Sequence, residues 1–224
     1  MKDTGGLMEV NHTSYQYAKE KYLHINNFMK NLTTTIKHLR NILVHKWWVM
    51  VYGRRMGINF WRLLVHDMSK FSPTEFWESV KYYKGDSSPI PECKKINGFS
   101  YAWQHHKGRN PHHYEYWTDN YDIGMTLIPM PYKYVCEMMA DWFAAGRTYQ
   151  GKEFTVKSQC DWWEWKKTTK PAIHEATIDL IDHIFMYIGE HPWDPFKVMR
   201  ESDPPLKWQY ELYMKTSTQF NHDR

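Results

Sequence analysis

The sequence places an imidazole and a carboxylate side by side, His66 and Asp67, directly after the apolar run 63–65. A buried carboxylate is costly unless it is paired or bound to a cation. Adjacent residues of a helix point in different directions, because residues on one face are three and four positions apart. The two side chains can therefore bind one ion only where helices converge, which requires a packed fold with ligands from distant segments. The alternative is a surface helix on which Asp67 pairs with Lys70.

Further potential ligands lie on both sides of this pair. His45 belongs to the preceding helical segment, and the stretch 105–113 holds four histidines, namely His105, His106, His112 and His113. His105 and His112 are seven positions apart, and so are His106 and His113. The Gly-Pro turn between them can direct two imidazoles at one point. A solvated, weakly basic turn is the alternative interpretation.

Two acids complete the candidate ligand set. Glu137 and Asp141 are four positions apart and share one face of a later helix. Imidazoles combined with carboxylates suit divalent ions such as Mn, Co, Mg, Fe or Zn, and we expect one or two ions. A solvated acidic face is the alternative, although Met138, Trp142 and Phe143 surround the two acids.

Apolar residues recur at helical spacing along most of the chain. A helical pattern covers residues 14–55, which Asn31 or a neighbour could break in two. Its expected buried stripe consists of Ile36, Leu39, Leu43 and Trp47, widened by Ile42 and Val49.

The later helices are marked by their start and stop signals. Asn59 is expected to cap a helix that carries residues 61–67, and Ser72 and Glu75 form a capping box for a helix that runs to about Tyr83. Residues 85–100 read as a long loop or lid. The other expected helices cover 101–104, a short segment from Pro111, 131–150, 154–168 and 171–189. No strand alternation or hairpin signal is present, so the predicted fold class is all-α.

The bulk properties narrow the domain organisation. We expect a flexible N-terminal arm over residues 1–13, one helical domain over 14–190, and a C-terminal extension with a docked helix over 191–224. No apolar run approaches the ~18 residues of a membrane span. The first residues lack the apolar core of a signal peptide. Three widely spaced cysteines, at positions 93, 136 and 160, predict neither a disulfide framework nor a zinc site. A cytoplasmic protein is the expectation.

The composition also limits the partners. A net charge of +4, with 29 basic and 25 acidic residues interspersed, does not give the basic stripe that duplex nucleic acid requires. The aromatic content of 17% suits packed helices, with base stacking as the alternative. A small-molecule substrate is therefore the expected partner, no membrane partner is expected, and a homo-oligomer is left open.

These motifs carry a resemblance to a known superfamily. In this chain, the order is His45, then His66-Asp67-Met68-Ser69-Lys70, then the histidine cluster, then Asp141. This order resembles the metal-binding signature of the HD-domain superfamily. HDMSK is similar to the HDxGK form of its phosphodiesterase branch, with Ser69 in place of the glycine. The stretches HDMSKFSPTEF, WQHHKGRNPHHYEYW and EMMADWFAAGR are together similar to a bacterial and phage family of unknown function.

The superfamily resemblance implies a helical bundle and a metal-dependent phosphohydrolase acting on a nucleotide or related phosphoester. In that case His45, His66, Asp67 and Asp141 hold the first metal, and members of the cluster His105, His106, His112 and His113 hold a second metal or bind phosphate. The implied catalytic residues are Asp67, Lys70 and Glu137. Phosphate contacts are expected from Lys70, Lys107, Arg109 and Arg147, and base stacking from Trp103, Tyr116 or Trp117.

Two other functions remain open on the sequence. An HD-type di-iron oxygenase would use the same histidines and acids for two irons. A non-catalytic nucleotide-binding or anti-defence module would keep a metal for structure or to sequester a nucleotide. The motifs of P-loop, dinucleotide-binding and HExxH proteins are absent from the sequence.

Overall fold

The protein is mainly helical, as predicted. The computed structural model describes residues 5–121, 124–200 and 205–220. The helices in this part of the chain are α1 Gly5–Arg55, α2 Phe60–Val65, α3 Pro73–Tyr82, α4 Pro89–Asn97, α5 Tyr101–Lys107, α6 Tyr132–Gln150, α7 Val156–Thr168, α8 Glu175–Glu190, α9 Lys197–Arg200 and α10 Pro205–Phe220. Short 3-10 turns cover Met68–Phe71, Tyr114–Tyr116 and Gly151–Glu153.

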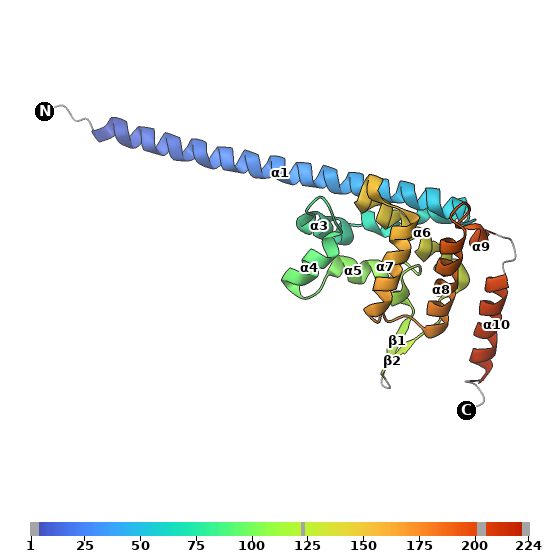
Figure 1. Cartoon of the computed structure of the whole chain (residues 1–224). Helices are drawn as coiled ribbons and strands as arrows, with labels where there is room; N and C mark the ends of the chain where they lie inside the picture. Colours follow the sequence, from blue (N-terminus) through green and yellow to red (C-terminus); the bar gives the residue numbers. More distant parts are fainter. Residues whose placement is uncertain (1–4, 122–123, 201–204, 221–224) are drawn as a thin grey trace.

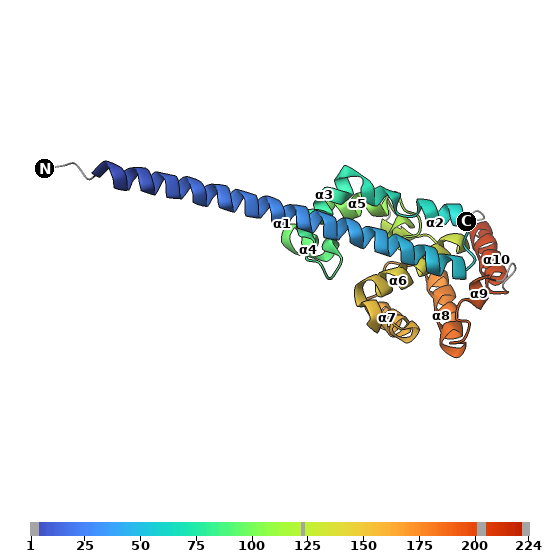
Figure 2. The ribbon, with the colours of Figure 1, turned by 90° about the horizontal axis from the view of Figure 1, so that it is seen from above.

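The core forms where the C-terminal half of α1 packs along α6. Val49 and Tyr52 of α1 meet Phe143 of α6, and the rings of Tyr52 and Phe143 lie 5.6 Å apart. Helices α7 and α8 pack against the rest of the bundle beside α6 (Figure 1). The α3–α5 segment lies on another side of α1 (Figure 2). The clustered histidines and acids that could hold a metal therefore lie between α1, α5 and α6, three segments that are distant in the sequence.

Helix α1 differs from its prediction in two ways. It runs without a break at Asn31 and begins at Gly5, inside the segment expected to be a flexible arm, while residues 1–4 lie outside the described residues. The expected buried stripe was wrong for its four central members Ile36, Leu39, Leu43 and Trp47, which are exposed, whereas Ile42 and Val49 are buried as predicted. The buried face instead carries His38, Ile42, His45 and Val49. Helical spacing is present on both faces, and the histidine-bearing face is buried because it packs on the metal-type residues and α6.

A hairpin that the sequence did not predict follows the 3-10 turn at Tyr114–Tyr116. Strands β1 Thr118–Tyr121 and β2 Gly124–Leu127 pair antiparallel, with Thr118 opposite Leu127 and Tyr121 opposite Gly124. Gly124 has φ +103°, which a glycine adopts without strain. The strands show no apolar alternation because residues 124–126 of β2 are exposed and neither strand needs a buried face.

Both predicted N-caps, Asn59 and Ser72, were confirmed, the second half of the predicted capping box is absent because the Glu75 carboxylate contacts His105 and His106, and several boundaries were wrong. Asn59 accepts a hydrogen bond from the Trp61 N–H, and Ser72 accepts one from the Glu75 N–H. Helix α2 ends at Val65, before His66 and Asp67. The expected loop 85–100 contains α4, and the helix expected from 171 begins at Glu175. The short helix expected from 111 is the 3-10 turn Tyr114–Tyr116.

The C-terminal segment adds a helix to the bundle. In α10, the Tyr210 hydroxyl donates to the Met130 carbonyl at 2.5 Å and lies 2.9 Å from the Thr177 hydroxyl. Tyr210 is thereby buried against α8 and the start of α6. Among the described residues, the helices do not combine the length and the hydropathy that a membrane crossing needs.

Candidate metal centre

The chain brings His66 and Asp67 to one point because helix α2 ends just before them. After α2 ends, His66 has extended backbone angles of φ −53° and ψ 130°, and Asp67 is left-handed with φ 56° and ψ 25°. Aspartate tolerates this conformation better than most residues, although it is uncommon. The turn removes the restriction that adjacent helical residues point in different directions. Both side chains are almost fully buried and face the same space.

The first ligand group joins α1, the turn after α2, and α6. His45 Nε2 lies 2.9 Å from Asp141 Oδ1 and 3.8 Å from Asp67 Oδ2. His66 Nε2 lies 3.4 Å from both of these carboxylate oxygens. One atom from each of the four residues falls within 4.8 Å of all the others. The four residues predicted for a first metal are therefore brought together.

The second group shares Asp67 and adds the histidine cluster. Asp67 Oδ1 lies 3.4 Å from His106 Nε2 and 3.2 Å from His112 Nε2. His113 Nε2 lies 2.8 Å from His106 Nε2. One atom from each of these four residues also falls within 4.8 Å of the rest. The Asp67 carboxylate therefore bridges the two groups, with one oxygen facing each.

The spacing and bonding of these atoms fit a bound cation. Metal–nitrogen and metal–oxygen bonds of about 2.1 Å place neighbouring ligand atoms about 3.0–3.4 Å apart. The separations within the two groups are close to this range. Among the described residues, five buried atoms have no hydrogen-bond partner of acceptable geometry, namely His45 Nε2, His66 Nε2, His112 Nε2 and both oxygens of Asp67, although Lys70 forms an ion pair with Asp67 Oδ2. Buried polar atoms are normally hydrogen-bonded, so this group has the donor atoms to hold a cation.

Two acids orient the imidazoles from outside. Glu137 Oε1 lies 3.0 Å from Nδ1 of His66 and 3.5 Å from Nδ1 of His112, while Arg62 Nε donates to Glu137 Oε2 at 2.5 Å. Glu75 Oε2 accepts from Nδ1 of His106 at 2.8 Å. Carboxylates on the far nitrogen fix the ring orientation of metal-binding histidines. His66, His112 and Glu137 could themselves hold an ion, but Glu137 is already paired with Arg62.

The contacts also set the charges of the centre. Burial opposes ionisation of Asp67, but His66 and Lys70 hold the pKa of its carboxyl well below the usual value. Burial likewise opposes a charged His66, yet the Asp67 carboxylate raises the pKa of this imidazole well above its ordinary range. Burial, with His112 and His106 nearby, lowers the pKa of His113 strongly. The carboxylates attract positive charge into the centre, and His113 is kept in the neutral form that a metal ligand needs.

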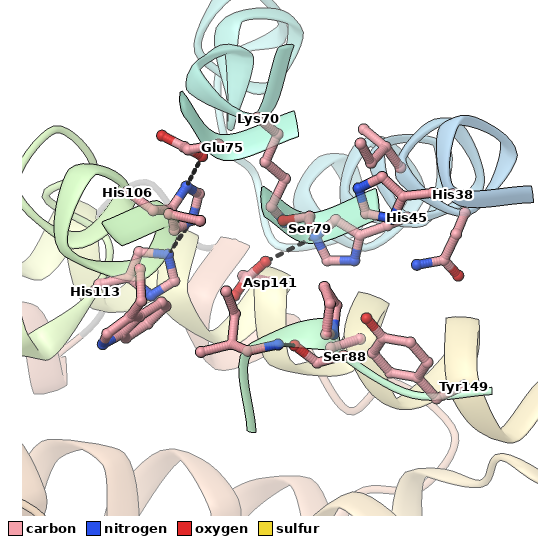
Figure 3. A pocket seen from close by; sticks show the side chains of 17 residues that line it. His38, His45, Lys70, Glu75, Ser79, Ser88, His106, His113, Asp141 and Tyr149 are labelled. Carbon is pink, nitrogen blue, oxygen red and sulfur yellow. Dashed lines mark hydrogen bonds and ion pairs between the residues drawn. The ribbon is translucent and has the colours of Figure 1, made fainter. Parts of the chain in front are cut away.

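A cavity of about 200 Å³ opens beside the two groups. Figure 3 shows His45 and Asp141 facing each other at its edge, with His106 between Glu75 and His113. Lys70 points into the same space, and its Nζ lies 2.6 Å from Asp67 Oδ2. The remaining lining residues come from α1, α3–α6 and the segment before α4: His38, Asn41, Ile42, Ser79, Ser88, Pro89, Ile90, Ala102, Trp103, Ala145 and Tyr149.

Several predicted residues lie away from this cavity. His105 is outside both groups, with Nδ1 2.6 Å from Glu75 Oε1. Lys107 and Arg109 do not line the cavity. Arg147 stacks over Trp48 and donates to the Gly151 carbonyl. Two of the three stacking candidates, Tyr116 and Trp117, pack against each other. The Trp117 Nε1 donates to the Pro111 carbonyl at 2.6 Å. Of the stacking candidates, only Trp103 lines the cavity.

The sequence analysis missed four residues that support the site. Glu75 was assigned to a capping box, but its side chain holds His105 and His106. Arg62 binds Glu137, and Asn110 donates to the Ser69 hydroxyl at 2.8 Å. Glu75 carried one usable signal, because an acid three positions into a helix close to the HD stretch is a candidate partner for any histidine. Arg62, Asn110 and Ser69 carried none.

Comparison with known proteins gives the affiliation of the chain. Residues 34–187, more than half of the sequence, match DUF5662, a family of unknown function. The chain belongs to DUF5662. The matched region begins within α1, ends in α8 and contains both ligand groups, so the candidate metal centre of this DUF5662 protein lies wholly inside the family domain. No curated protein and no solved structure matches the chain.

Proposed function

We propose that this protein is a metal-dependent phosphohydrolase that hydrolyses a nucleotide or a related phosphoester. One observation carries the proposal: two groups of imidazole and carboxylate side chains share Asp67, and members of both groups line a cavity together with Lys70. Paired ligand groups of this kind are typical of sites that clamp the oxygens of a phosphoryl group. The cavity gives a small ester room next to them.

The roles of the residues follow from their positions. His45, His66, Asp67 and Asp141 would hold one ion, and Asp67 with His106, His112 and His113 would hold a second. A divalent ion bound there lowers the pKa of a water molecule and polarises a phosphoryl oxygen. Lys70 Nζ is close enough to the shared carboxylate to place its positive charge beside a phosphoryl group at the same point.

The cavity wall supports a substrate with both an apolar and a polar part. Trp103, Pro89 and Ile90 supply apolar surface, and Ser79, Ser88 and Tyr149 supply hydroxyl groups. The Trp103 ring packs edge-on against His113 with centroids 5.2 Å apart, so its indole lies next to the second ligand group. A base or sugar ring bound against Trp103 would place its phosphate within reach of Lys70.

The test is a hydrolysis screen on purified protein. Chelator should abolish hydrolysis of one or more nucleotides or phosphoesters, and Mn²⁺, Co²⁺ or Mg²⁺ should restore it. Asp67→Asn should lose the activity, while His183→Asn, at an exposed histidine of α8, should retain it. Metal-loaded protein that is inert on a broad panel of mononucleotides, dinucleotides and cyclic nucleotides would contradict the proposal.

A di-iron oxygenase is the second candidate, and the donor set favours it. The two groups together supply five imidazoles and two carboxylates, and nitrogen-rich sets suit iron. Purified protein would then contain iron, absorb visible light and consume oxygen with a substrate.

A third outcome, metal bound tightly with no turnover of either kind, would favour a non-catalytic nucleotide-binding module.

A further inference from the structure

The N-terminal part of α1 extends beyond the rest of the protein. Both views show the helix leaving the bundle and continuing outward as a single rod (Figures 1 and 2). Every described side chain of residues 19–32 is exposed. Isolated helices are marginal in water, since most helical stability in proteins comes from packing of an apolar face. A rod of this length is therefore expected to pack against something.

The rod carries an apolar stripe with the spacing of a coiled coil. Seven residues follow one another at alternating steps of three and four: Tyr22, Ile25, Met29, Leu32, Ile36, Leu39 and Leu43. We call these seven residues the α1 stripe. All are exposed, with exposed fractions between 37% for Leu39 and 66% for Tyr22. An unbroken heptad pattern of this kind is the mark of a helix that packs against another helix along one seam.

The described residues of the chain leave this stripe uncovered. Along residues 38–49, the buried face of α1 carries His38, Ile42, His45 and Val49 and packs on the bundle. The α1 stripe lies about a third of a turn away from that face, and Leu39 and Leu43 stay exposed although the helix is docked. Along residues 22–36, where the rod has left the bundle, a partner helix has free access to the seam. The occupant must come from another molecule.

The flanks of the stripe match a second copy of this chain. In a coiled coil, charged residues beside the seam select a partner of opposite charge or repel a like one. The flanking positions between Lys21 and Arg40 are uncharged, namely Asn26, Phe28, Thr33 and Thr35. In register, a parallel pair places Arg40 beside Thr35, and an antiparallel pair places it beside Asn26. No like charges meet in either arrangement, and each stripe residue from 25 to 43 meets an apolar one.

We propose that α1 pairs with α1 of a second copy along the α1 stripe, which makes the protein a dimer. The stripe begins before residue 34, where the match to the family starts, so the rod adds a pairing element to the family domain. The inference is independent of any activity of the metal centre, because none of the seven stripe residues belongs to a ligand group or lines the cavity.

The experiment measures the mass of the full chain by light scattering and sedimentation. The wild type should have twice the 27.2 kDa of one chain. Leu32→Glu with Ile36→Glu should raise the dissociation constant of the dimer by about 100-fold or more, because four like charges enter one seam. The matched control is Asn27→Glu with Asn31→Glu, which has the same spacing and charge change on exposed positions away from the stripe. The control should remain a dimer.

A gentler pair separates loss of pairing from loss of the helix. Leu32→Ala with Ile36→Ala keeps strong helix formers in the rod and removes only apolar contacts. It should weaken the dimer while the circular dichroism of the bundle and its melting temperature stay unchanged. A wild-type mass of one chain, or of three or more, at 100-micromolar concentration overturns the proposal. So does a stripe variant that pairs as tightly as the control.

Discussion

Glu137 Oε1 lies 3.0 Å from Nδ1 of His66, on the side of the ring opposite to Nε2, which faces Asp67 and Asp141. The contact fixes the orientation and tautomer of the imidazole, and the same oxygen lies 3.5 Å from Nδ1 of His112. One carboxylate thus supports a ligand of each group. Sequence analysis placed Glu137 among the catalytic residues, and the structure places it behind the two rings, paired with Arg62.

We expect Glu137→Gln to lower the affinity for divalent metal by about 10–100-fold, the usual effect of removing such a partner. The amide keeps the shape of the side chain but loses the charge that holds His66 and Arg62. A competition titration against a fluorescent chelator measures the change. Glu190→Gln, at an exposed acid of α8, is the matched control. Equal affinity in the two variants would show that Glu137 does not support the centre.

The shared position of Asp67 predicts a defined pattern of metal loss. Asp141 belongs only to the first group and His113 only to the second, whereas Asp67 belongs to both. Asp141→Ala and His113→Ala should each lose one of two ions per chain, and Asp67→Ala should lose both. Elemental analysis after dialysis measures the ratio of metal to protein. His183→Ala should keep the wild-type content. An Asp67→Ala protein with its full metal content would contradict the bridging arrangement.

The sequence predicted the identity of the ligands better than the path that assembles them. His45, His66, Asp67 and Asp141 were identified because buried imidazoles and carboxylates are informative residue types. The left-handed conformation of Asp67 could not be predicted from the sequence, because positive φ is usually marked by a glycine and this position holds an aspartate. The pattern therefore predicted a helix through both residues, whereas α2 ends at Val65.

The apolar pattern of α1 shows a second limit. Its two faces, the α1 stripe and the face with Ile42 and Val49, both have helical spacing. The sequence analysis joined part of the stripe, Ile36, Leu39 and Leu43, with Ile42 and Val49 into one buried face, and only the latter two are buried. Spacing identifies a face that can pack but not what it packs against. Burial of the histidine-bearing face depends on α6, almost 100 positions away, and no local pattern encodes that contact.

Glu78 is expected to stabilise the helix that presents His106. Its Oε1 accepts from the Ser100 hydroxyl at 2.6 Å and the Ala102 N–H at 2.9 Å, and its Oε2 accepts from the Tyr101 N–H at 3.2 Å. These bonds satisfy free N–H groups at the start of α5. Glu78→Ala should lower the free energy of unfolding by about 1–3 kcal/mol.

Urea denaturation of metal-free protein measures this change. Glu153→Ala, at an exposed acid outside the site, should alter the free energy of unfolding by less than about 0.5 kcal/mol. Because α5 carries His106, the Glu78 variant should also bind metal more weakly at the second group. A Glu78→Ala protein as stable as the control would show that water replaces the carboxylate at no cost.

His38 should make the stability of the protein depend on pH. Its ring is buried against Phe76 and Tyr83, with centroids 5.5 and 5.1 Å away, and its Nδ1 has no hydrogen-bond partner. Burial, with the positive charge of Lys70 second, lowers the pKa of His38 to about 4. In the unfolded chain His38 has a pKa near 6.5, so between pH 6.5 and pH 4 it is protonated there while it stays neutral in the folded protein. Stability is therefore lost as the pH falls from 6.5 to 4.

Replacement by glutamine should remove this part of the pH dependence. The difference in the free energy of unfolding between wild type and His38→Gln should shift by on the order of 2 kcal/mol between pH 7 and pH 4, with the variant favoured in acid. Urea denaturation of metal-free protein at both values measures it, because other titrating groups cancel in the comparison. His24→Gln, on the exposed part of α1, should follow the wild type. If His38→Gln loses as much stability in acid as the wild type, then His38 is protonated in the folded protein and its burial does not keep it neutral.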